Sequence, residues 1–277
     1  MHSLLAGKAL LIDMDGVVYR GGEAIPGAAE FIAGLQRDRV PFLFVTNNSD
    51  HPIDSFIAKL ARMHIQVGAE HLFTAGQATA RALVEQIGPT GCAYTIAGPG
   101  THDALRAAGW STREDEGAPY GHGRIDPVGV QAVVIGEGYK LTALRLEQAI
   151  LLCMAGVPLY ATNPDTFIPG PGGVRLIGTG CLYAGIEVAT GKKARVVGKP
   201  AAPMYRYALE KLGRDSAQPA VHAAAAMIGD RLDTDISGAK AIGMTGVLVL
   251  SGATTAAMVP GFEPAPDLVV GSLADLG

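Results

Sequence analysis

Short apolar runs of strand length alternate along this chain with longer segments whose apolar residues recur at helical spacing. Parallel strands must be joined by crossover segments, which are usually helices, so this alternation predicts an α/β fold built on a doubly wound parallel sheet. The expected strands lie near Ala9–Ile12, Phe42–Thr46, His71–Thr74, Ala93–Ala97, Ala132–Ile135, Leu159–Ala161, Val196–Val197, Ala225–Gly229 and Gly246–Leu250. The expected helices are Ala28–Leu35, Ile53–Met63, Ala78–Gln86, His102–Ala108, Leu141–Met154, Leu182–Ala189 and Met204–Leu212.

Two stretches interrupt this alternation and indicate how the chain is divided into domains. Ser111–Gly129 is polar and rich in glycine, and Asn163–Gly173 holds several prolines and glycines that we expect to prevent regular structure. We therefore expect a middle segment that is inserted into a sheet whose strands come from both ends of the chain. The candidate chemical residues lie in the flanking parts.

Composition and charge limit the classes of function. The chain has 277 residues, which gives room for two domains, and 48% hydrophobic residues are enough for a sizeable core. Its net charge of -4 gives no reason to expect nucleic acid as a partner. Cys92, Cys153 and Cys181 form no C-x-x-C pair, and no apolar run is long enough for a signal peptide or a membrane span. We expect a cytoplasmic protein with no membrane partner.

Two acids follow the first expected strand. Asp13 and Asp15 have one residue between them and Gly16 behind them. Because side chains alternate along a strand, we expect both carboxylates to point to the same side while Met14 turns away. Like charges this close repel each other unless a cation or a shared proton separates them. Mg²⁺ prefers oxygen ligands, so this strand end predicts a metal site.

Polar residues follow two further strands. Phe42–Thr46 leads into Asn47 and Asn48, and Val196–Val197 leads into Lys199. In open α/β sheets ligands bind beyond the carboxyl ends of the strands, where a hydroxyl, amides and a lysine suit phosphate oxygens. The alternative interpretations are an Asn/Ser turn that caps a helix, and a solvated lysine before a turn.

A second group of acids follows the strand Ala225–Gly229. Asp230 would complete a metal site with the first pair, and Asp235 would order that site from outside it. Asp233 and Thr234 have a simpler interpretation, because either residue can cap the helix that follows.

Taken in order, these strand ends carry acids, then a hydroxyl with amides, then a lysine, then acids again. They resemble the four motifs of the haloacid dehalogenase superfamily of phosphohydrolases: D-x-D-G, a Thr/Ser strand end, Lys, and G-D-x-x-x-x-D. The resemblance runs from Asp13 to about Gly252. Four segments look like the branch that contains NagD and 4-nitrophenylphosphatase, namely Thr46–Ser49, Ala161–Asp165, Gly178–Gly180 and Val197–Pro200.

The resemblance implies a phosphoric monoester hydrolase that works through an aspartyl-phosphate intermediate on a small phosphorylated metabolite. Asp13 would be the nucleophile, and Asp15 would first protonate the leaving alcohol and then activate the attacking water. Asp13, the backbone carbonyl of Asp15, and Asp230 would hold Mg²⁺.

The same resemblance implies how the phosphoryl group is held. Thr46, the amides at Asn47 and Asn48, and Lys199 would bind its remaining oxygens. A second acid at Asp15 favours a phosphatase over the dehalogenase and phosphonatase branches, but it does not identify the alcohol.

The resemblance also implies an α/β cap domain, here residues 80–193, inserted between the core segments 1–79 and 194–277. Such a cap would lie over the strand ends, exclude water other than the attacking one and contact the leaving group. A homodimer formed through the cap is compatible with this branch of the family.

The expected cap departs from the family pattern in one segment. The usual Gly-x-Asp appears here as Gly136-Glu137-Gly138, so the aspartate is absent and no named substrate is transferred to this chain. The candidate substrate contacts are Glu137, Lys140, Asn163, Asp165 and Arg175. An ordinary surface role is the alternative interpretation of each.

A second hypothesis comes from a different class of protein. Receiver domains also gather acids, a Thr or Ser and a Lys around Mg²⁺ on a parallel sheet, which would make this chain a phosphoacceptor or phosphate-binding regulatory module without turnover. Receiver domains are much shorter and place their acceptor aspartate on a strand after the acid pair. Here the acid pair itself opens the chain and a large insertion follows, so the enzyme is the preferred hypothesis.

Overall fold

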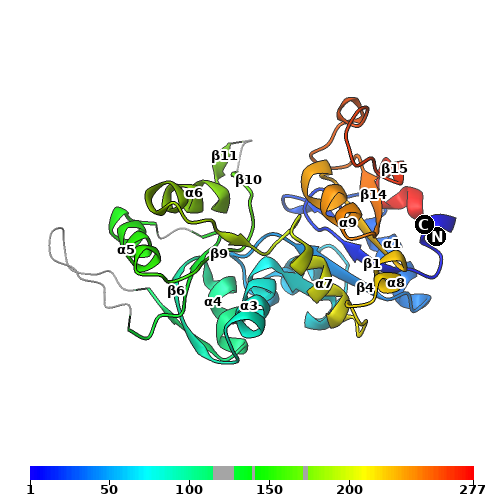
Figure 1. Cartoon of the computed structure of the whole chain (residues 1–277). Helices are drawn as coiled ribbons and strands as arrows, with labels where there is room; N and C mark the ends of the chain where they lie inside the picture. The colour runs from blue at the N-terminus through cyan, green and yellow to red at the C-terminus, as the bar shows by residue number, and fades with distance from the viewer. Residues whose placement is uncertain (115–127, 139–140, 171–173) are drawn as a thin grey trace. The chain divides into compact units, whose positions relative to one another are not determined.

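The computed structural model describes residues 1–114, 128–138, 141–170 and 174–277 (Figure 1). The chain forms two compact units. Unit 1 consists of Met1–Thr46, Ile53–Phe73 and Lys199–Gly277, and unit 2 consists of Asn47–Pro52 and Thr74–Gly198.

Unit 1 is built on a six-stranded sheet in the order β15-β14-β13-β1-β4-β5. The central strand β1 pairs in parallel with β13 on one side and with β4 on the other, and β14 runs parallel to both β13 and β15. The strands are β1 Ala9–Ile12, β4 Phe42–Thr46, β5 Leu72–Thr74, β13 Ala225–Gly229, β14 Thr245–Val249 and β15 Leu268–Val270. A separate short hairpin pairs β2 Tyr19–Arg20 with β3 Glu23–Ala24.

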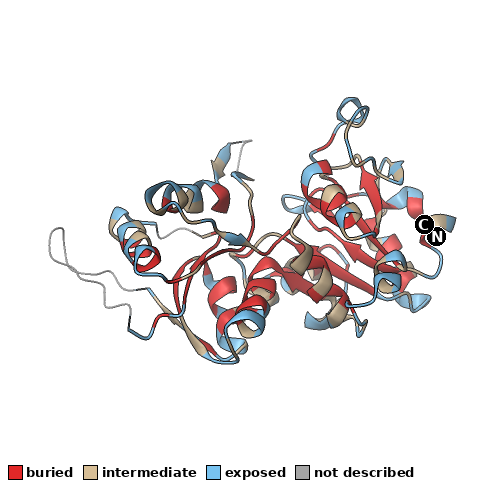
Figure 2. Ribbon diagram, in the orientation of Figure 1, coloured by how far each residue is buried: buried red, intermediate tan, exposed pale blue. Residues whose placement is uncertain are grey.

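Helices cover both faces of this sheet, so its central strands are buried throughout (Figure 2). Val247 and Val249 pack with the core that contains α1 and α2, whereas Leu248 between them packs with Leu232 and Ile236 on the opposite face. The helices are α1 Ala28–Arg37, α2 Ile53–Arg62, α7 Ala202–Lys211, α8 Pro219–Ala223, α9 Ser237–Ala241, the π-helix η4 Leu232–Ile236, and the 3-10 helices η1 Ser3–Leu5, η2 Ala69–His71, η5 Ala256–Met258 and η6 Leu273–Leu276.

Unit 2 contains its own five-stranded parallel sheet in the order β12-β9-β8-β6-β7. Its strands are β6 Gly91–Ile96, β7 Trp110–Arg113, β8 Ala132–Ile135, β9 Leu159–Ala161 and β12 Arg195–Val196, with an antiparallel hairpin of β10 Phe167–Pro169 and β11 Arg175–Ile177. Its helices are α3 Ala75–Gln86, α4 Pro99–Ala107, α5 Ala143–Met154 and α6 Thr179–Thr190.

The predicted fold class is confirmed: a parallel α/β sheet takes its strands from both ends of the chain, and a second α/β unit comes from the middle. The expectation that Asn163–Gly173 has no regular structure is wrong, because β10 pairs with β11 in a two-stranded hairpin that accommodates Pro169 at its end. Trp110–Arg113 also forms an edge strand at the start of the polar stretch Ser111–Gly129. Residues 115–127 of that stretch lie outside the described residues.

Candidate active site

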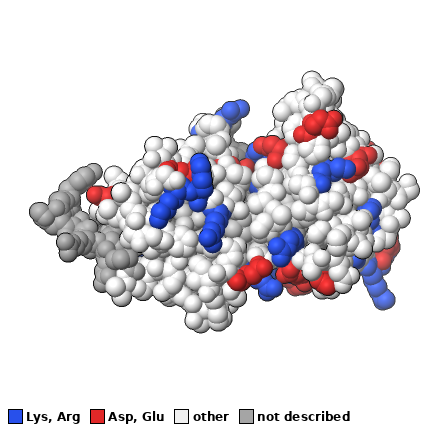
Figure 3. All heavy atoms as spheres, in the orientation of Figure 1, with Lys and Arg blue, Asp and Glu red and all other residues white. Residues whose placement is uncertain are grey.

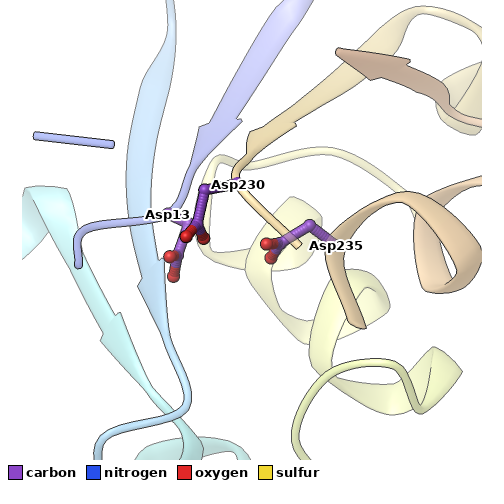
Figure 4. Close-up of side chains that lie close together, drawn as sticks. All are labelled: Asp13, Asp230 and Asp235. Atoms are coloured by element: carbon purple, nitrogen blue, oxygen red, sulfur yellow. The ribbon is translucent and has the colours of Figure 1, made fainter. Parts of the chain in front are cut away.

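Three buried carboxylates gather at the carboxyl ends of neighbouring strands in unit 1 (Figure 4). Asp13 follows β1, and Asp230 follows β13, which pairs with β1. Asp235 comes from the π-helix η4. The ligand atoms of all three lie within 4.8 Å of one another. Carboxylate oxygens this close together form an arrangement that can hold a hard metal ion.

The ammonium group of Lys199 lies among these carboxylates. Its Nζ donates to Asp13 Oδ1 at 2.5 Å, to Asp235 Oδ1 at 2.7 Å and to the carbonyl oxygen of Val45 at 3.1 Å. Burial by itself would lower the pKa of Lys199, but the two carboxylates outweigh burial and raise that pKa above its ordinary value. Lys199 is therefore a buried cation that links the ends of β1 and β4 to η4.

One ammonium does not balance three carboxylates. Burial raises the pKa of Asp13 well above its ordinary value, and the neighbouring Asp235 and Asp230 raise it further, against the opposing effect of Lys199. Burial and Asp235 raise the pKa of Asp230 to about 6. Negative charge is thus in surplus at this strand end, and a bound divalent cation would relieve the repulsion.

Local backbone features bring Asp230 and Asp235 to this position. The Arg231 N–H donates to Asp235 Oδ2 at 3.1 Å within the single π-helical turn, a feature that is frequent at functional sites. A Cβ on Gly229 would lie 2.2 Å from Asp235 Cγ, and a Cβ on Gly16 would lie 2.4 Å from Asp230 Oδ2. Glycine at both positions therefore lets the backbone approach these two acids closely.

Asp15 lies apart from this group: among the residues that the structure describes, its carboxylate is not one of the gathered ligands. Strand alternation does not extend to Asp15, because β1 ends at Ile12 and the chain turns, with Asp15 bridging to Tyr19. Although the side chain is exposed, the surrounding protein partly desolvates it and raises the pKa of Asp15, which the Lys59 ammonium offsets in part.

Tyr19 and Lys59 are two residues near Asp15 that the sequence analysis did not single out. Lys59 Nζ lies 3.4 Å from the centroid of the buried Tyr19 ring, a cation–π contact. The two residues come from β2 and α2. No local motif signals this contact, since it arises only when the helix packs beside the hairpin.

The residues after β4 divide between the two units. Thr46 ends the strand and is buried in unit 1, whereas Asn47 and Asn48 cluster with unit 2. Asn48 Oδ1 accepts from the N–H groups of Asp50 and His51 at 3.2 and 3.3 Å, which is the turn-capping role named as the alternative interpretation. The structure therefore groups Asp13, Lys199, Asp230 and Asp235 directly, and it engages the side chains of Asn47 and Asn48 elsewhere.

Unit 2 has a buried polar cluster of its own at the carboxyl ends of β8 and β9. Asn47 Nδ2 donates to Asp165 Oδ2 at 2.9 Å, and Asn163 Nδ2 donates to the carbonyl oxygen of Asn47 at 2.9 Å and to Glu137 Oε1 at 3.3 Å. Burial, with a contribution from Asp165, raises the pKa of Glu137 to about 8. Burial thus favours the neutral, protonated form of the Glu137 carboxyl group.

Two other candidate substrate contacts gain no support from these interactions. Arg175 is exposed on β11, with its guanidinium 5.6 Å from the centroid of the Phe167 ring. Lys140 lies outside the described residues.

The surface and the helices add two observations. On the face that Figure 3 shows, basic and acidic side chains are interspersed and do not form a broad field of one sign. None of the helices in the described ranges is both long and apolar enough to cross a membrane.

Comparison with family models relates both ends of the chain to one family. Residues 10–111 match the model of the haloacid dehalogenase-like hydrolases, and residues 196–276 match a second model described as HAD-hydrolase-like. Among curated proteins, the acid sugar phosphatase of Staphylococcus epidermidis is 36% identical over 248 residues, which cover 90% of this chain and 88% of the relative. The dihydroxyacetone phosphatase of Corynebacterium glutamicum is 34% identical over 266 residues, 96% and 89% of the two chains.

Solved structures give the same relationship. The 4-nitrophenylphosphatase of Thermotoga maritima superposes with a TM-score of 0.85 at 30% identity and covers 100% of this chain and 98% of its own. NagD from E. coli superposes with a TM-score of 0.83 at 28% identity, with 98% of both chains covered.

Proposed function

Because this chain belongs to the haloacid dehalogenase-like hydrolases, in the branch of NagD and 4-nitrophenylphosphatase, we propose that it hydrolyses small phosphate monoesters through an aspartyl-phosphate intermediate. The chain is a phosphoric monoester hydrolase. The observation that carries the proposed mechanism is the group of Asp13, Asp230 and Asp235 around the ammonium of Lys199.

The first half of the proposed reaction transfers the phosphoryl group to the enzyme. A carboxylate oxygen of Asp13 attacks phosphorus in line while the bond from phosphorus to the oxygen of the leaving alcohol breaks. Asp15 gives its proton to the oxygen of the leaving alcohol. In the second half, water attacks phosphorus and loses a proton to Asp15. The bond between Asp13 and phosphorus then breaks, which releases phosphate and restores the carboxylate.

The donor set fits Mg²⁺, because carboxylate oxygens with a surplus of negative charge are the ligands that this ion takes. Asp13, Asp230 and the backbone carbonyl of Asp15 would hold it, and when bound it would draw charge from the transferring group. Asp235 takes a different part: through its contact with Lys199 it fixes the ammonium beside Asp13.

The remaining phosphoryl oxygens need donors that do not depend on the leaving group. We assign this role to Thr46, Lys199 and the backbone N–H groups of Asn47 and Asn48, since the side chains of the two asparagines are engaged in hydrogen bonds within unit 2. Residues 80–193 are proposed to act as the cap that contacts the leaving alcohol. Cytoplasmic location and a homodimer through the cap are further parts of the proposal.

Turnover of a generic ester tests this function. The purified protein should hydrolyse 4-nitrophenyl phosphate with Mg²⁺, lose that activity with EDTA and regain it when Mg²⁺ is restored. Asp13→Asn should lower kcat by roughly a thousandfold or more, because the amide keeps the size of the side chain but is not a nucleophile. Asp215→Asn, an exposed acid of the same unit, is the matched control and should leave kcat unchanged.

The phosphatase hypothesis and the hypothesis of a regulatory module without turnover predict different results. A wild-type rate in Asp13→Asn would show that the nucleophile is wrongly assigned. Stable phosphorylation or phosphate binding, with no turnover of any ester in a panel of phosphorylated metabolites, would instead favour the regulatory module.

A further inference from the structure

The segment Asn47–Pro52 belongs to unit 2, although it directly follows β4 of unit 1 in the chain. Within unit 2 it is fixed against the start of α4. The Gly100 N–H donates to the carbonyl oxygen of Asp50 at 2.6 Å, and Thr101 Oγ1 donates to that of Ser49 at 2.9 Å. Unit 2 therefore controls the conformation of the residues that follow Thr46.

Asn163 and Asp165 hold Asn47 at two points. Asn163 Nδ2 donates to the Asn47 carbonyl oxygen, and Asp165 Oδ2 accepts from Asn47 Nδ2, both at 2.9 Å. The Asp165 N–H donates to Asn163 Oδ1 at 3.1 Å, which joins the two holding residues to each other. These bonds fix both the side chain and the backbone of Asn47.

Glu137 fixes the direction of the Asn163 amide. Asn163 Nδ2 carries two hydrogens, and they have separate acceptors in Glu137 Oε1 at 3.3 Å and the Asn47 carbonyl oxygen. Asn163 is fully buried and Glu137 is 6% exposed, so water competes little for these bonds. The amide is thereby held in one orientation.

The carbonyl that Asn163 binds has a direct connection to the phosphate-binding backbone. The oxygen of Asn47 and the N–H of Asn48 belong to one planar peptide group, so fixing the oxygen also fixes the direction of that N–H. A hydrogen bond to the oxygen also polarises the peptide and makes its N–H a better donor.

We propose that Asn163 and Asp165 are positioning residues, which orient the Asn47–Asn48 peptide to donate to the transferring phosphoryl group. Neither residue then contacts the leaving alcohol, in contrast to the substrate contacts that the sequence analysis considered. This inference rests on the proposed function, because it takes the Asn48 N–H as a phosphate donor.

Kinetics with different leaving groups tests the inference. Asp165→Ala and Asn163→Ala should each lower kcat/KM by about tenfold, by the same factor for 4-nitrophenyl phosphate and for an alkyl ester such as glycerol phosphate. Each should also weaken competitive inhibition by inorganic phosphate by a similar factor, because phosphate has no leaving group. Asp103→Ala changes an exposed acid of unit 2 that pairs with Arg106, and as the matched control it should alter none of these values.

A conservative variant separates positioning from a loss of folding. Asp165→Asn keeps an oxygen acceptor for Asn47 Nδ2, so it should recover most of the activity that Asp165→Ala loses and should melt at the wild-type temperature. If Asp165→Ala does not fold, the comparison of Asp165→Asn with Asn163→Ala tests the inference. Only Asn163→Ala removes a hydrogen bond to Asn47, so only this variant should lose activity.

The possible results of these experiments either support the positioning role of Asn163 and Asp165 or overturn it. A loss that depends on the leaving group, or a loss with unchanged inhibition by phosphate, overturns the inference and makes these residues substrate contacts. If the wild type hydrolyses no ester, the proposed function fails, and weaker binding of inorganic phosphate in the variants, measured by calorimetry, still supports the positioning role. A wild type that binds no phosphate overturns both.

Discussion

At the scale of single residues, charge decides what the candidate site can do. Lys199 is buried among Asp13 and Asp235, where one ammonium faces more negative charge than it can neutralise. Removing one partner of such a buried group leaves an uncompensated charge, which costs more than the pair itself contributes. Surplus negative charge would also repel an anionic substrate unless a cation offsets it, so this arrangement is better explained by a bound divalent cation than by stability.

The sequence predicted which residues meet but not every contact between them. Asp13 and Asp230 follow neighbouring strands of one parallel sheet, and parallel strands bring their carboxyl ends to one edge, so their convergence follows from the pattern. Lys199 follows β12, which belongs to the sheet of unit 2, so its contact with Asp13 does not follow from a shared sheet edge. Direct contact between Asp235 and Lys199 does not follow from the pattern either, because it depends on a π-helical turn that no spacing announces. Lys59 was missed for a similar reason, since its contact with Tyr19 exists only in the packed unit.

Glu137 gives a prediction about stability and pH. Its pKa is about 8 in the folded chain against an ordinary value of 4.5, so between these values the unfolded chain loses a proton that the folded chain keeps. The free energy of unfolding should therefore fall as pH rises through this window, by about 1.4 kcal/mol per pH unit at most. Glu137→Gln cannot ionise, so its stability should exceed that of the wild type at pH 8 and match it below the ordinary pKa of 4.5.

Urea denaturation at several pH values measures this difference. Glu147→Gln replaces an exposed carboxylate of the same unit and should leave the wild-type slope unchanged. Asp165 and Asp50 are the two acids that face Glu137, and both are present in the wild type and in the two variants. Parallel pH profiles for Glu137→Gln and the wild type would show that Glu137 is already ionised in the folded chain.

At the scale of elements, the predicted strands and helices are those with long apolar runs or clear helical period. The strands that the sequence analysis did not predict are short: β7 and β15 lie at sheet edges, and β2 with β3 and β10 with β11 form two-stranded hairpins. Such strands have one pairing partner and little buried surface, so their sequences carry only part of the usual alternation. The short helix α8 was not predicted either, and α9 was predicted without bounds, as the helix that follows Asp233 and Thr234. Pro169 in β10 illustrates the point, because proline is accepted at a hairpin end although it signals a break within a strand.

The junction between β13 and η4 gives a prediction at this scale. A Cβ on Gly229 would lie 2.2 Å from Asp235 Cγ, and Asp235 cannot move away because Lys199 and the Arg231 N–H hold its carboxylate. Gly229→Ala should therefore lower the free energy of unfolding by about 1–3 kcal/mol and reduce kcat at least tenfold, roughly. Gly22→Ala, where an added Cβ meets open space, is the control. Equal stability and activity in the two variants would mean that the junction relaxes.

At the scale of the whole molecule, the two units divide the proposed work. The acids, Thr46 and Lys199 belong to unit 1, whereas Asn47, Asn48 and the residues that hold them belong to unit 2. The central strands of both sheets run parallel, and each sheet has polar residues at the carboxyl ends of its strands. The proposed phosphoryl chemistry thus depends on unit 1, and the proposed control of the Asn47–Asn48 peptide depends on unit 2.

A metal ion that binds only the folded chain must stabilise that chain, and this gives a prediction that needs no substrate. With saturating Mg²⁺ the melting temperature of the wild type should rise by roughly 5 °C over its value in EDTA. Asp230→Asn removes one of the gathered carboxylates, so it should melt no lower than the wild type in EDTA, because repulsion is relieved, but below it in Mg²⁺.

The informative result is that Asp230→Asn melts below the wild type in Mg²⁺ but not in EDTA. A variant that merely damages the fold would melt lower than the wild type in both conditions. Asp233→Asn changes an exposed acid of the π-helix η4, which begins two residues after Asp230, and this acid pairs with Arg231; the variant should respond to Mg²⁺ as the wild type does. If Mg²⁺ raises the melting temperature of Asp230→Asn as much as that of the wild type, the ion binds elsewhere. Since the measured quantity is stability, it tests Asp230 as part of a cation site independently of whether Asp13 is the nucleophile.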